Sequence, residues 1–248
     1  MKKSLFVALA ILLNATVWSS WVDVPGAEEG LISYQQQTRG NLSLDFSLNG
    51  YEMEEITRDG IDYTRISYPE EGKILAIGMP DLPVFTRLIA IPDQGDVTLN
   101  IISNDYKIIS DIVIYPQEEL LTESEPVRDT YTRNNEYYRQ GGIFPAQIAT
   151  VGEPAIMRDV RLVKVTFYPF SYDAEKRELH VYENISVEVV TSGRGGINTI
   201  ENQKAPSRAF TSIFESSILN YPEIAATRDE FQRPAILFIY PNDNNVEI

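Results

Sequence analysis

The 248-residue chain has no cysteine and a single histidine, His180. The absence of cysteine excludes disulfide bonds, a thiolate nucleophile and thiolate metal ligands within these residues. One histidine cannot form the imidazole clusters that hold zinc, and no nucleophile-elbow pattern accompanies it. His180 alternates with Leu179 and Val181, as in a short surface strand, so we assign it no catalytic role. We expect no metal, no cofactor and no enzymatic activity of this chain's own.

The sequence also lacks a hydrophobic run long enough to cross a bilayer, which takes about 20 apolar residues. Its short apolar run, Leu5–Leu13, follows two lysines and precedes small residues, as in a secretory signal peptide. We therefore interpret residues 1–19 as a signal peptide, with cleavage between Ser19 and Ser20. The chain is then exported to the periplasm, the cell surface or the extracellular space. We expect no membrane span after the signal is removed.

Basic residues are few, because 21 lysines and arginines stand against 36 aspartates and glutamates, for a formal net charge of −15. Binding to a phosphate backbone depends on clustered Lys and Arg, so we expect no nucleic-acid partner. An acidic surface suits a soluble exported domain or one with a basic protein partner. Two carboxylates are enough for a glycoside hydrolase, and the many acids leave that class open, although no pair stands out.

The residues that are abundant predict β structure. Segment Asn41–Asn49 alternates apolar and polar residues, which predicts a half-buried strand with Leu42, Leu44, Phe46 and Leu48 on its buried face. Further strands are predicted at 61–68, 73–77, 84–91, 97–103, 106–115, 160–168, 178–182 and 185–190.

Turn residues separate these strands about every ten residues. Asn49-Gly50 and Asp59-Gly60 are strong hairpin signals, and Ser103-Asn-Asp105 predicts a turn between the two strands beside it. Many short strands with such turns are typical of an antiparallel β-sandwich. We therefore predict a mainly β fold, with a sandwich-like domain over residues 20–200.

The regular pattern stops between Pro116 and Pro154. A connection of this length indicates a functional or mobile segment. It carries Arg128, Arg133 and Arg139 in surroundings that look exposed and irregular. An exposed, extended arginine is what a trypsin-like specificity pocket recognises, although a solvated loop charge explains any single one of them better.

After the sandwich, Pro206–Tyr221 changes to a helical period with one apolar face, which predicts one amphipathic helix. We assign residues 201–233 to this helix and to a cleavable polar linker. Arg228 and Arg233 are the candidate processing sites in that linker. Arg233 precedes a proline, which makes a poor scissile bond for most peptidases, so Arg228 is the favoured site.

The last residues have a different pattern. Ala235–Tyr240 is an unbroken apolar run, which is typical of a strand buried on both faces of a parallel sheet. We therefore predict residues 234–248 to be the first strand of a second, truncated α/β domain.

Several short segments, taken in order, resemble the propeptides of gingipain-type cysteine peptidases and the start of their peptidase domain. The first, Gly78-Met-Pro-Asp-Leu-Pro83, is similar to a Gly-x-Pro-x-Leu-Pro segment of that family. The others are Met157–Arg161, Val163–Pro169, Tyr172-Asp173, Leu179–Val190, Phe210, Ile218–Tyr221 and Arg233–Ile248. Together they extend over about residues 40–248.

The resemblance implies a role and a partner. In that family the peptidase has a caspase-like α/β fold with a Cys–His pair, and neither residue of the pair lies in this chain. The chain would then be the propeptide of a secreted cysteine endopeptidase, which it keeps latent and helps to fold until the linker is cut. The partner would be the cognate peptidase domain in cis. Arg128, Arg133 or Arg139 would fill its specificity pocket, and the family includes Arg- and Lys-directed members.

An exported β-sandwich that serves as an adhesion or glycan-binding module is the alternative. It explains the acidity, the aromatic residues and the export equally well. Tyr131, Tyr137 and Tyr138 would then form a platform on which sugars stack. It does not explain the buried type of strand at Ala235–Tyr240.

Overall fold

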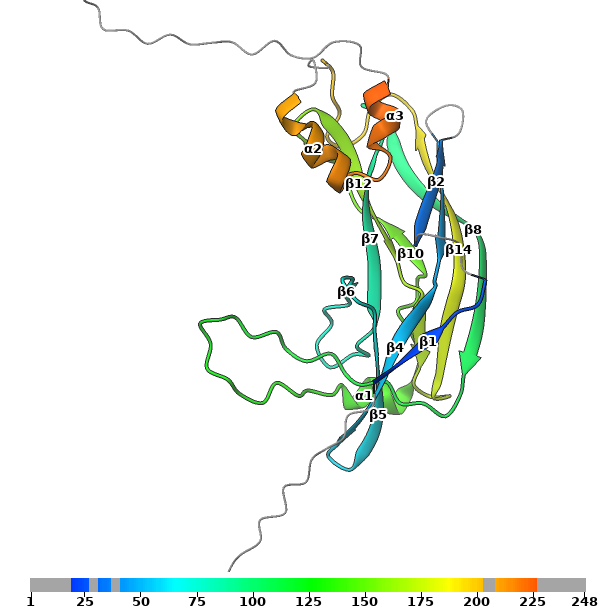
Figure 1. The fold of residues 1–248 in the computed structure, drawn as a ribbon, viewed down its shortest axis with the longest axis vertical. Helices are drawn as coiled ribbons and strands as arrows, with labels where there is room; N and C mark the ends of the chain where they lie inside the picture. The colour runs from blue at the N-terminus through cyan, green and yellow to red at the C-terminus, as the bar shows by residue number, and fades with distance from the viewer. Residues whose placement is uncertain (1–18, 27–30, 37–40, 203–207, 227–248) are drawn as a thin grey trace, which may run out of the picture.

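The computed structural model describes residues 19–26, 31–36, 41–202 and 208–226, which form an elongated β-sandwich (Figure 1). The strands are β1 (Ser19–Asp23), β2 (Ile32–Gln36), β3 (Leu42–Ser47), β4 (Gly50–Arg58), β5 (Ile61–Ser67), β6 (Gly72–Lys73), β7 (Pro83–Ala90), β8 (Asp96–Ile109), β9 (Ile143–Phe144), β10 (Ala149–Val151), β11 (Ala155–Met157), β12 (Val160–Phe167), β13 (Phe170–Asp173) and β14 (Glu178–Ser192). The helices are α1 (Asn135–Gln140), α2 (Arg208–Ser217) and α3 (Tyr221–Ala226). The predicted mainly β sandwich is confirmed.

Two sheets face each other in the sandwich. One contains β2, β3, β14, β13 and β9 in this order, with β8 along the other edge of β14. The facing sheet contains β10, β12, β7 and β6, with β11 beside β12. A smaller sheet, β1-β4-β5, continues from the lower end in Figure 1. Every pairing between these strands is antiparallel, as expected for hairpin-rich β proteins.

The core lies between the two facing sheets. Phe46 of β3 meets Phe85 of β7 and Phe167 of β12, with ring centroids 5.0 and 5.4 Å apart. The four apolar residues predicted on the buried face of Asn41–Asn49 are all buried. Alternation along one strand was therefore enough to predict which side chains join the sheets.

The two hairpin signals have different outcomes. Asp59-Gly60 joins β4 to β5 with both residues at positive φ, at 51° and 75°, so this hairpin is confirmed. Asn49-Gly50 is not a hairpin, because β3 and β4 belong to different sheets. A Cβ at Gly50 would overlap the Trp21 ring, so glycine leaves room for that indole at the corner between the sheets.

Three of the strand predictions were wrong in their boundaries. No turn forms at Ser103-Asn-Asp105, because β8 continues through it and stays paired with β14. The predicted strands 178–182 and 185–190 are likewise one strand, β14, and shifts in register absorb the irregularity between them. The strand predicted at 73–77 shortens to β6.

The sequence predicts His180 on a surface strand, and this prediction is wrong, because the His180 side chain is buried with only 8% of it exposed. The correction follows from the length of β8, which places Tyr106 against the histidine with ring centroids 5.2 Å apart. A strand that appears solvent-facing in the sequence is thus covered by a neighbour from far along the chain.

The predicted single helix is two helices, α2 and α3, separated by residues 218–220, which we call the clip. At the clip, the Leu219 N–H donates to the Leu88 carbonyl of β7 at 2.9 Å. The Asn220 side chain accepts from the Ala90 N–H at 2.7 Å and donates to the Ala90 carbonyl at 2.9 Å. These contacts hold the helical segment against the edge of β7.

Other predictions lie outside the described residues. They concern the signal peptide up to residue 18, the strand at Ala235–Tyr240, and the processing sites Arg228 and Arg233. Within the described ranges, no helix has the length and apolar character that crossing a bilayer requires.

Candidate functional site

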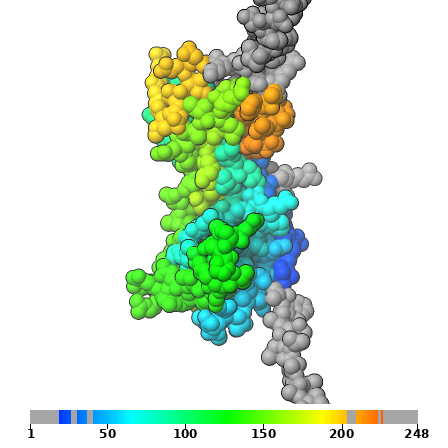
Figure 2. Space-filling view, turned by 90° about the vertical axis from the view of Figure 1, so that its left-hand side faces the viewer, coloured from blue at the N-terminus to red at the C-terminus, as the bar shows by residue number. Residues whose placement is uncertain are grey.

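Residues 118–132 leave the sandwich between β8 and α1 and project from it as a long loop, here called the arm (Figure 1). Figure 2 shows the arm nearly end-on, as green atoms that stand out over the cyan strands. Its outer side chains meet solvent, since Val127 is 98% and Leu120 is 63% exposed. The irregular segment predicted between Pro116 and Pro154 thus contains one projecting feature, together with α1, β9 and β10.

Both ends of the arm are anchored on residues 78–81, which we call the socket. The Gly78 N–H donates to the Gln117 carbonyl at 2.8 Å, and the Gln117 N–H donates to the Met79 carbonyl at 2.7 Å. On the returning side, the Asn134 N–H donates to the Gly78 carbonyl at 2.9 Å. Gly78 has φ +77°, and a Cβ there would lie 3.0 Å from the Asn134 nitrogen, so this position requires glycine.

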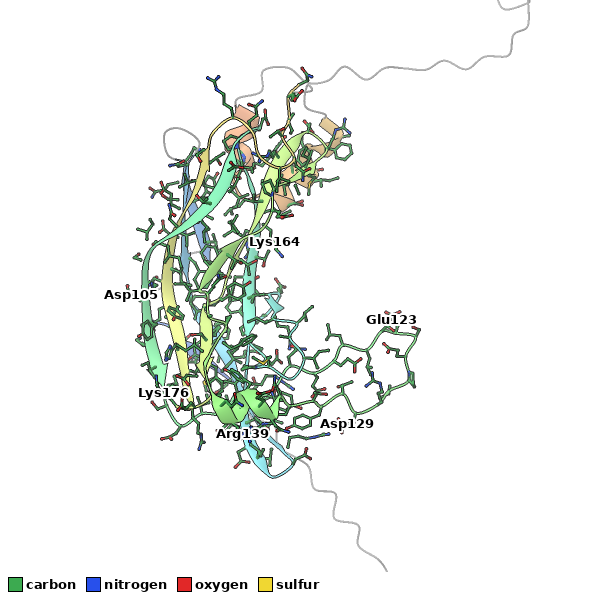
Figure 3. The ribbon with its side chains drawn as sticks, turned by 180° about the vertical axis from the view of Figure 1, so that it is seen from behind. Asp105, Glu123, Asp129, Arg139, Lys164 and Lys176 are labelled. Atoms are coloured by element: carbon green, nitrogen blue, oxygen red, sulfur yellow. The ribbon has the colours of Figure 1, made fainter. Side chains whose placement is uncertain are left out.

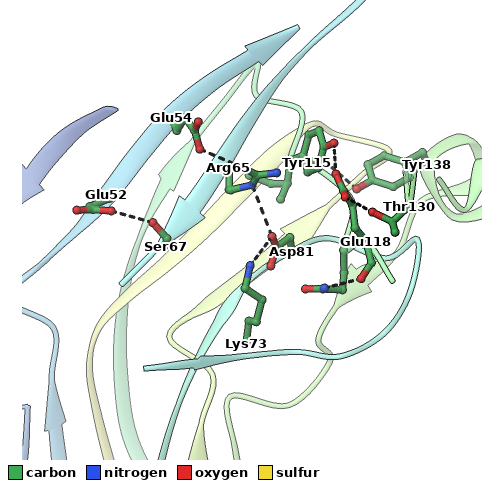
Figure 4. Close-up of polar contacts among 12 residues, drawn as sticks. Glu52, Glu54, Arg65, Ser67, Lys73, Asp81, Tyr115, Glu118, Thr130 and Tyr138 are labelled. Carbon is green, nitrogen blue, oxygen red and sulfur yellow. Dashed lines mark hydrogen bonds and ion pairs between the residues drawn. The ribbon is translucent and has the colours of Figure 1, made fainter. Parts of the chain in front are cut away.

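The last residue of the socket, Asp81, is a buried carboxylate (Figure 4). Asp81 is 3% exposed and accepts from the Lys73 ammonium at 2.9 Å, while the Arg65 Nε lies 3.7 Å away. Burial raises the pKa of Asp81 above its ordinary value, although these two cations act in the opposite direction. Arg65 also pairs with Glu54 at 3.2 Å and stacks over the Tyr115 ring. The cluster links β5, β6 and the root of the arm.

Glu118 joins the two runs of the arm at its base. The Tyr115 hydroxyl donates to this carboxylate at 2.5 Å, and the Thr130 hydroxyl donates to its other oxygen (Figure 4). Burial alone would raise the pKa of Glu118, but the hydrogen bonds from Thr130 and Tyr115 outweigh it and lower that pKa. The ionised carboxylate is therefore the form that holds the arm's base together.

Two further braces lie farther out along the arm. Arg128 pairs with Glu119 across it, at 2.9 Å. At the tip, the Glu125 carboxylate accepts from the N–H and the hydroxyl of Thr122, which closes a turn. Figure 3 shows the tip near Glu123 standing well away from the sandwich.

The returning run is tied to the small sheet. Arg58 of β4 pairs with Asp129 and lies over the Tyr131 ring, 5.0 Å from its centroid. The Tyr131 hydroxyl lies 2.9 Å from that of Tyr63, in β5. The arm is therefore an ordered projection with its conformation supported at several levels.

The structure separates the three predicted arginines. Arg128 alone lies on the arm, where its side chain is exposed. Arg133 follows the arm, half-buried over the Tyr138 ring, and Arg139 lies at the end of α1. Arg133 and Arg139 line one shallow hollow of about 580 Å³ between α1, β5 and the turn before β14.

The three tyrosines proposed as a sugar platform do not form one. Tyr137 and Tyr138 donate their hydroxyls inward, to the Tyr172 and Ile114 carbonyls, and their rings are nearly perpendicular at 86°. Tyr131 packs against the tyrosines at the root of the arm. A flat surface of exposed rings, which stacking on a sugar needs, is absent from these residues.

Sequence reasoning missed the residues that support the arm. In the sequence, Gly78 and Asp81 stand out only as part of a resembling segment, and no pattern distinguishes Glu118 from the other acids. The turn-like composition of Gly78-Met-Pro-Asp is a signal for an irregular backbone, but its partners lie near residues 117 and 134, far along the chain. Among the residues that the structure describes, no group of three acids or histidines could hold a metal ion.

The comparisons with known proteins agree on one family. The family model Propeptide_C25 matches residues 30–228. Gingipain R1 of Porphyromonas gingivalis is 26% identical over 207 residues, which cover 77% of this chain and 21% of that protein. Gingipain R2 of strain W83 is 27% identical over 184 residues, which cover 73% of this chain and 25% of that protein. The chain thus spans between a fifth and a quarter of the length of these relatives.

Solved structures share the fold. A chain in the "Complex of Porphyromonas gingivalis RgpB pro- and mature domains" superposes with a TM-score of 0.69 at 23% identity, covering 79% of this chain and all of that one. A chain from a study of the zymogenic latency of gingipain K, from the same organism, gives 0.59 at 22% identity, covering 71% and 99%. With the family match over most of its length, the chain belongs to the Propeptide_C25 family, the gingipain-type propeptides.

Proposed function

We propose that this chain is the N-terminal propeptide of an exported gingipain-like cysteine endopeptidase, which it keeps latent and helps to fold. The family match and the fold shared with a pro- and mature-domain complex support the proposal. The peptidase domain would be bound in cis, and activity would appear once the linker after α3 is cut. The match to a propeptide family favours this function over the adhesion alternative, and so does the inward packing of the tyrosines.

The observation that carries the proposal is the braced arm with Arg128 on its outer part. Val127, beside it, is almost fully exposed, so this stretch offers an apolar side chain and a cation to a cleft. The pair between Arg128 and Glu119 is exposed, and such pairs contribute less than about 1 kcal/mol. A specificity pocket that binds the guanidinium can therefore replace Glu119 at little cost.

The order of the arm strengthens such binding. A flexible loop loses conformational entropy when it enters a cleft, whereas a loop already held in one shape loses less. The bonds at Glu118, at Arg58 and at the socket hold the arm before any partner arrives. Affinity then arises from pre-organisation as well as from contact.

The tether sets how completely the site is closed. A domain linked to its partner acts at an effective concentration on the order of millimolar. With a contact of about micromolar affinity, the closed state would then be about a thousand times as populated as the open state. After the linker is cut, the same contact becomes a bimolecular one, and latency falls on dilution.

The test is inhibition of the cognate peptidase by the separate chain, comparing the wild type with Arg128→Ala. We expect Arg128→Ala to raise the inhibition constant at least about thirtyfold, as for the loss of an interface anchor worth about 2 kcal/mol. Arg194→Ala is the matched control, because Arg194 is also an exposed loop arginine. Equal inhibition by Arg128→Ala and Arg194→Ala would remove Arg128 from the mechanism, and a wild type without inhibition would refute the function.

A further inference from the structure

The hollow beside α1 gathers positive charge on a chain that is otherwise strongly acidic. Its lining includes Arg133, Arg139 and Arg177, against a formal net charge of −15 for the whole chain. Most other described arginines are paired with carboxylates, but none of these three forms an ion pair with a described residue. Three uncompensated guanidinium groups thus face one depression.

Arg133 has donor capacity that the protein leaves unused. Its guanidinium lies over the Tyr138 ring, 4.3 Å from the centroid, and its Nη1 donates to the Asn135 side chain at 2.7 Å. Its Nε is buried and has no hydrogen-bond partner.

Two tyrosine side chains in the lining of the hollow have their hydroxyls committed inside the protein. Tyr138 and Tyr172 line it, and their hydroxyls already donate to the Ile114 and Ile112 carbonyls, at 2.8 and 2.9 Å. Burial raises the pKa of Tyr172 to about 12, while the charges of Arg177 and Arg133 act in the opposite direction. Both guanidinium groups are therefore close enough to affect the same ring.

Two carboxylates also line the hollow, Asp62 and Glu175. The Asp62 carboxylate accepts from the Thr57 hydroxyl at 2.7 Å, and Glu175 is exposed. Neither approaches an arginine of the hollow within the 4.0 Å of an ion pair in the described structure. Three arginines against two acids leave the lining of the hollow with a net positive charge.

We propose that the hollow receives an acidic side chain of the peptidase domain, as a second contact beside the arm. A carboxylate matches the planar guanidinium group with two parallel hydrogen bonds, so this ligand chemistry suits three arginines. The position fits, because Arg133 directly precedes Asn134, the residue that the socket bonds, and Figure 3 places Arg139 at the foot of the arm. A domain that takes the arm into its cleft would come close to Arg133 and Arg139, at the foot of the arm.

This inference rests on the proposed function, and its test keeps the two apart. The full chain is assayed as an inhibitor of the cognate peptidase at low and high salt, as wild type and as Arg139→Ala/Arg177→Ala. We expect the double variant to raise the inhibition constant at least tenfold at low salt and to weaken its salt dependence. Arg194→Ala is the matched control, because Arg194 lies just after β14 and Arg177 just before it. This control should inhibit like the wild type.

Three outcomes decide the matter. If the wild type inhibits and Arg139→Ala/Arg177→Ala matches Arg194→Ala at both salt concentrations, the hollow is not a contact, although the function stands. If the double variant loses binding of inorganic phosphate but keeps its inhibition constant, the hollow binds small anions and the proposal is again wrong. Arg139→Lys/Arg177→Lys, which keeps the charge but not the paired donors, should inhibit with intermediate strength, and unfolding in urea should be unchanged for all variants.

Discussion

Gly78 connects a single backbone angle to the position of the whole arm. Its positive φ turns the socket so that its N–H and carbonyl reach Gln117 and Asn134, one on each side of the arm. A side chain at this position would be strained by the positive φ, and its Cβ would lie only 3.0 Å from the Asn134 nitrogen. One glycine therefore bonds to both flanks of the arm, Gln117 and Asn134, although it lies far earlier in the sequence.

We expect Gly78→Ala to lower the free energy of unfolding by about 2–3 kcal/mol, from left-handed strain together with the close contact to Asn134. Inhibition should weaken as the root of the arm shifts. Urea unfolding measures the first effect. Gly193→Ala is the control, since Gly193 has a similar φ of +83° but open space around it. If both variants lose the same stability, the contact with Asn134 contributes nothing.

At this scale the sequence was informative where the pattern was local. The alternation of Leu42, Leu44 and Phe46 predicted their burial, and Asp59-Gly60 predicted its hairpin. The role of Gly78 could not be predicted, because the atoms that require glycine belong to residue 134. Arg128 was predicted only as one of three, and exposure on the arm distinguishes it from Arg133 and Arg139.

At the scale of elements, the Asn220 side chain of the clip makes the hydrogen bonds with β7 that a neighbouring strand would otherwise make. Asn220 is 1% exposed, and its amide satisfies both backbone groups of Ala90 at the end of β7. An amide side chain can do this because it carries a donor and an acceptor in the same geometry as a peptide group. The helical segment thus joins the sheet without adding a strand.

We expect Asn220→Ala to destabilise the chain by about 2 kcal/mol or more, because two buried backbone groups lose their partners. Limited proteolysis should cut the α2–α3 segment sooner, and urea unfolding should give the change in free energy. Ser216→Ala, on the exposed face of α2, is the comparison and should change stability by less than 0.5 kcal/mol, roughly the range of surface substitutions. An Asn220→Ala variant as stable as Ser216→Ala would contradict this assignment.

The sequence could predict the existence of most strands but not their partners. Ser103-Asn-Asp105 has the composition of a turn, yet pairing with β14 keeps it extended. Asn49-Gly50 was misread for the same reason, since the next strand joins another sheet. Both errors come from interactions with residues distant in sequence, which local propensity does not contain.

At the scale of the whole molecule, the sandwich separates the exit of the chain from the arm. Figure 1 places α2 and α3 at one end, and α1 with the arm at the other. Under the proposed function, a peptidase domain that follows α3 and accepts the arm would lie along the length of the sandwich. The linker then joins two contacts that are far apart, so cutting it leaves the arm in place until dilution separates the domains.

We expect the first cut in the full precursor to follow Arg228, in the segment after α3. Arg228→Ala should delay activation and remove the new N-terminus that begins at Asp229, as N-terminal sequencing over a time course would show. Arg233→Ala should activate normally, because the bond between Arg233 and Pro234 is a poor substrate. Recovery of a first product that begins at Pro234 would contradict this order.

The supports on either side of Arg128 also determine what a single nick in the arm would accomplish. If the bond between Arg128 and Asp129 were hydrolysed, the new amino end would stay fastened through Asp129 to Arg58 and through Thr130 to Glu118. The new carboxyl end would stay attached through Glu118 and the backbone pairing at Gln117. Severed termini held this close dissociate slowly, so a nicked arm would continue to occupy the cleft.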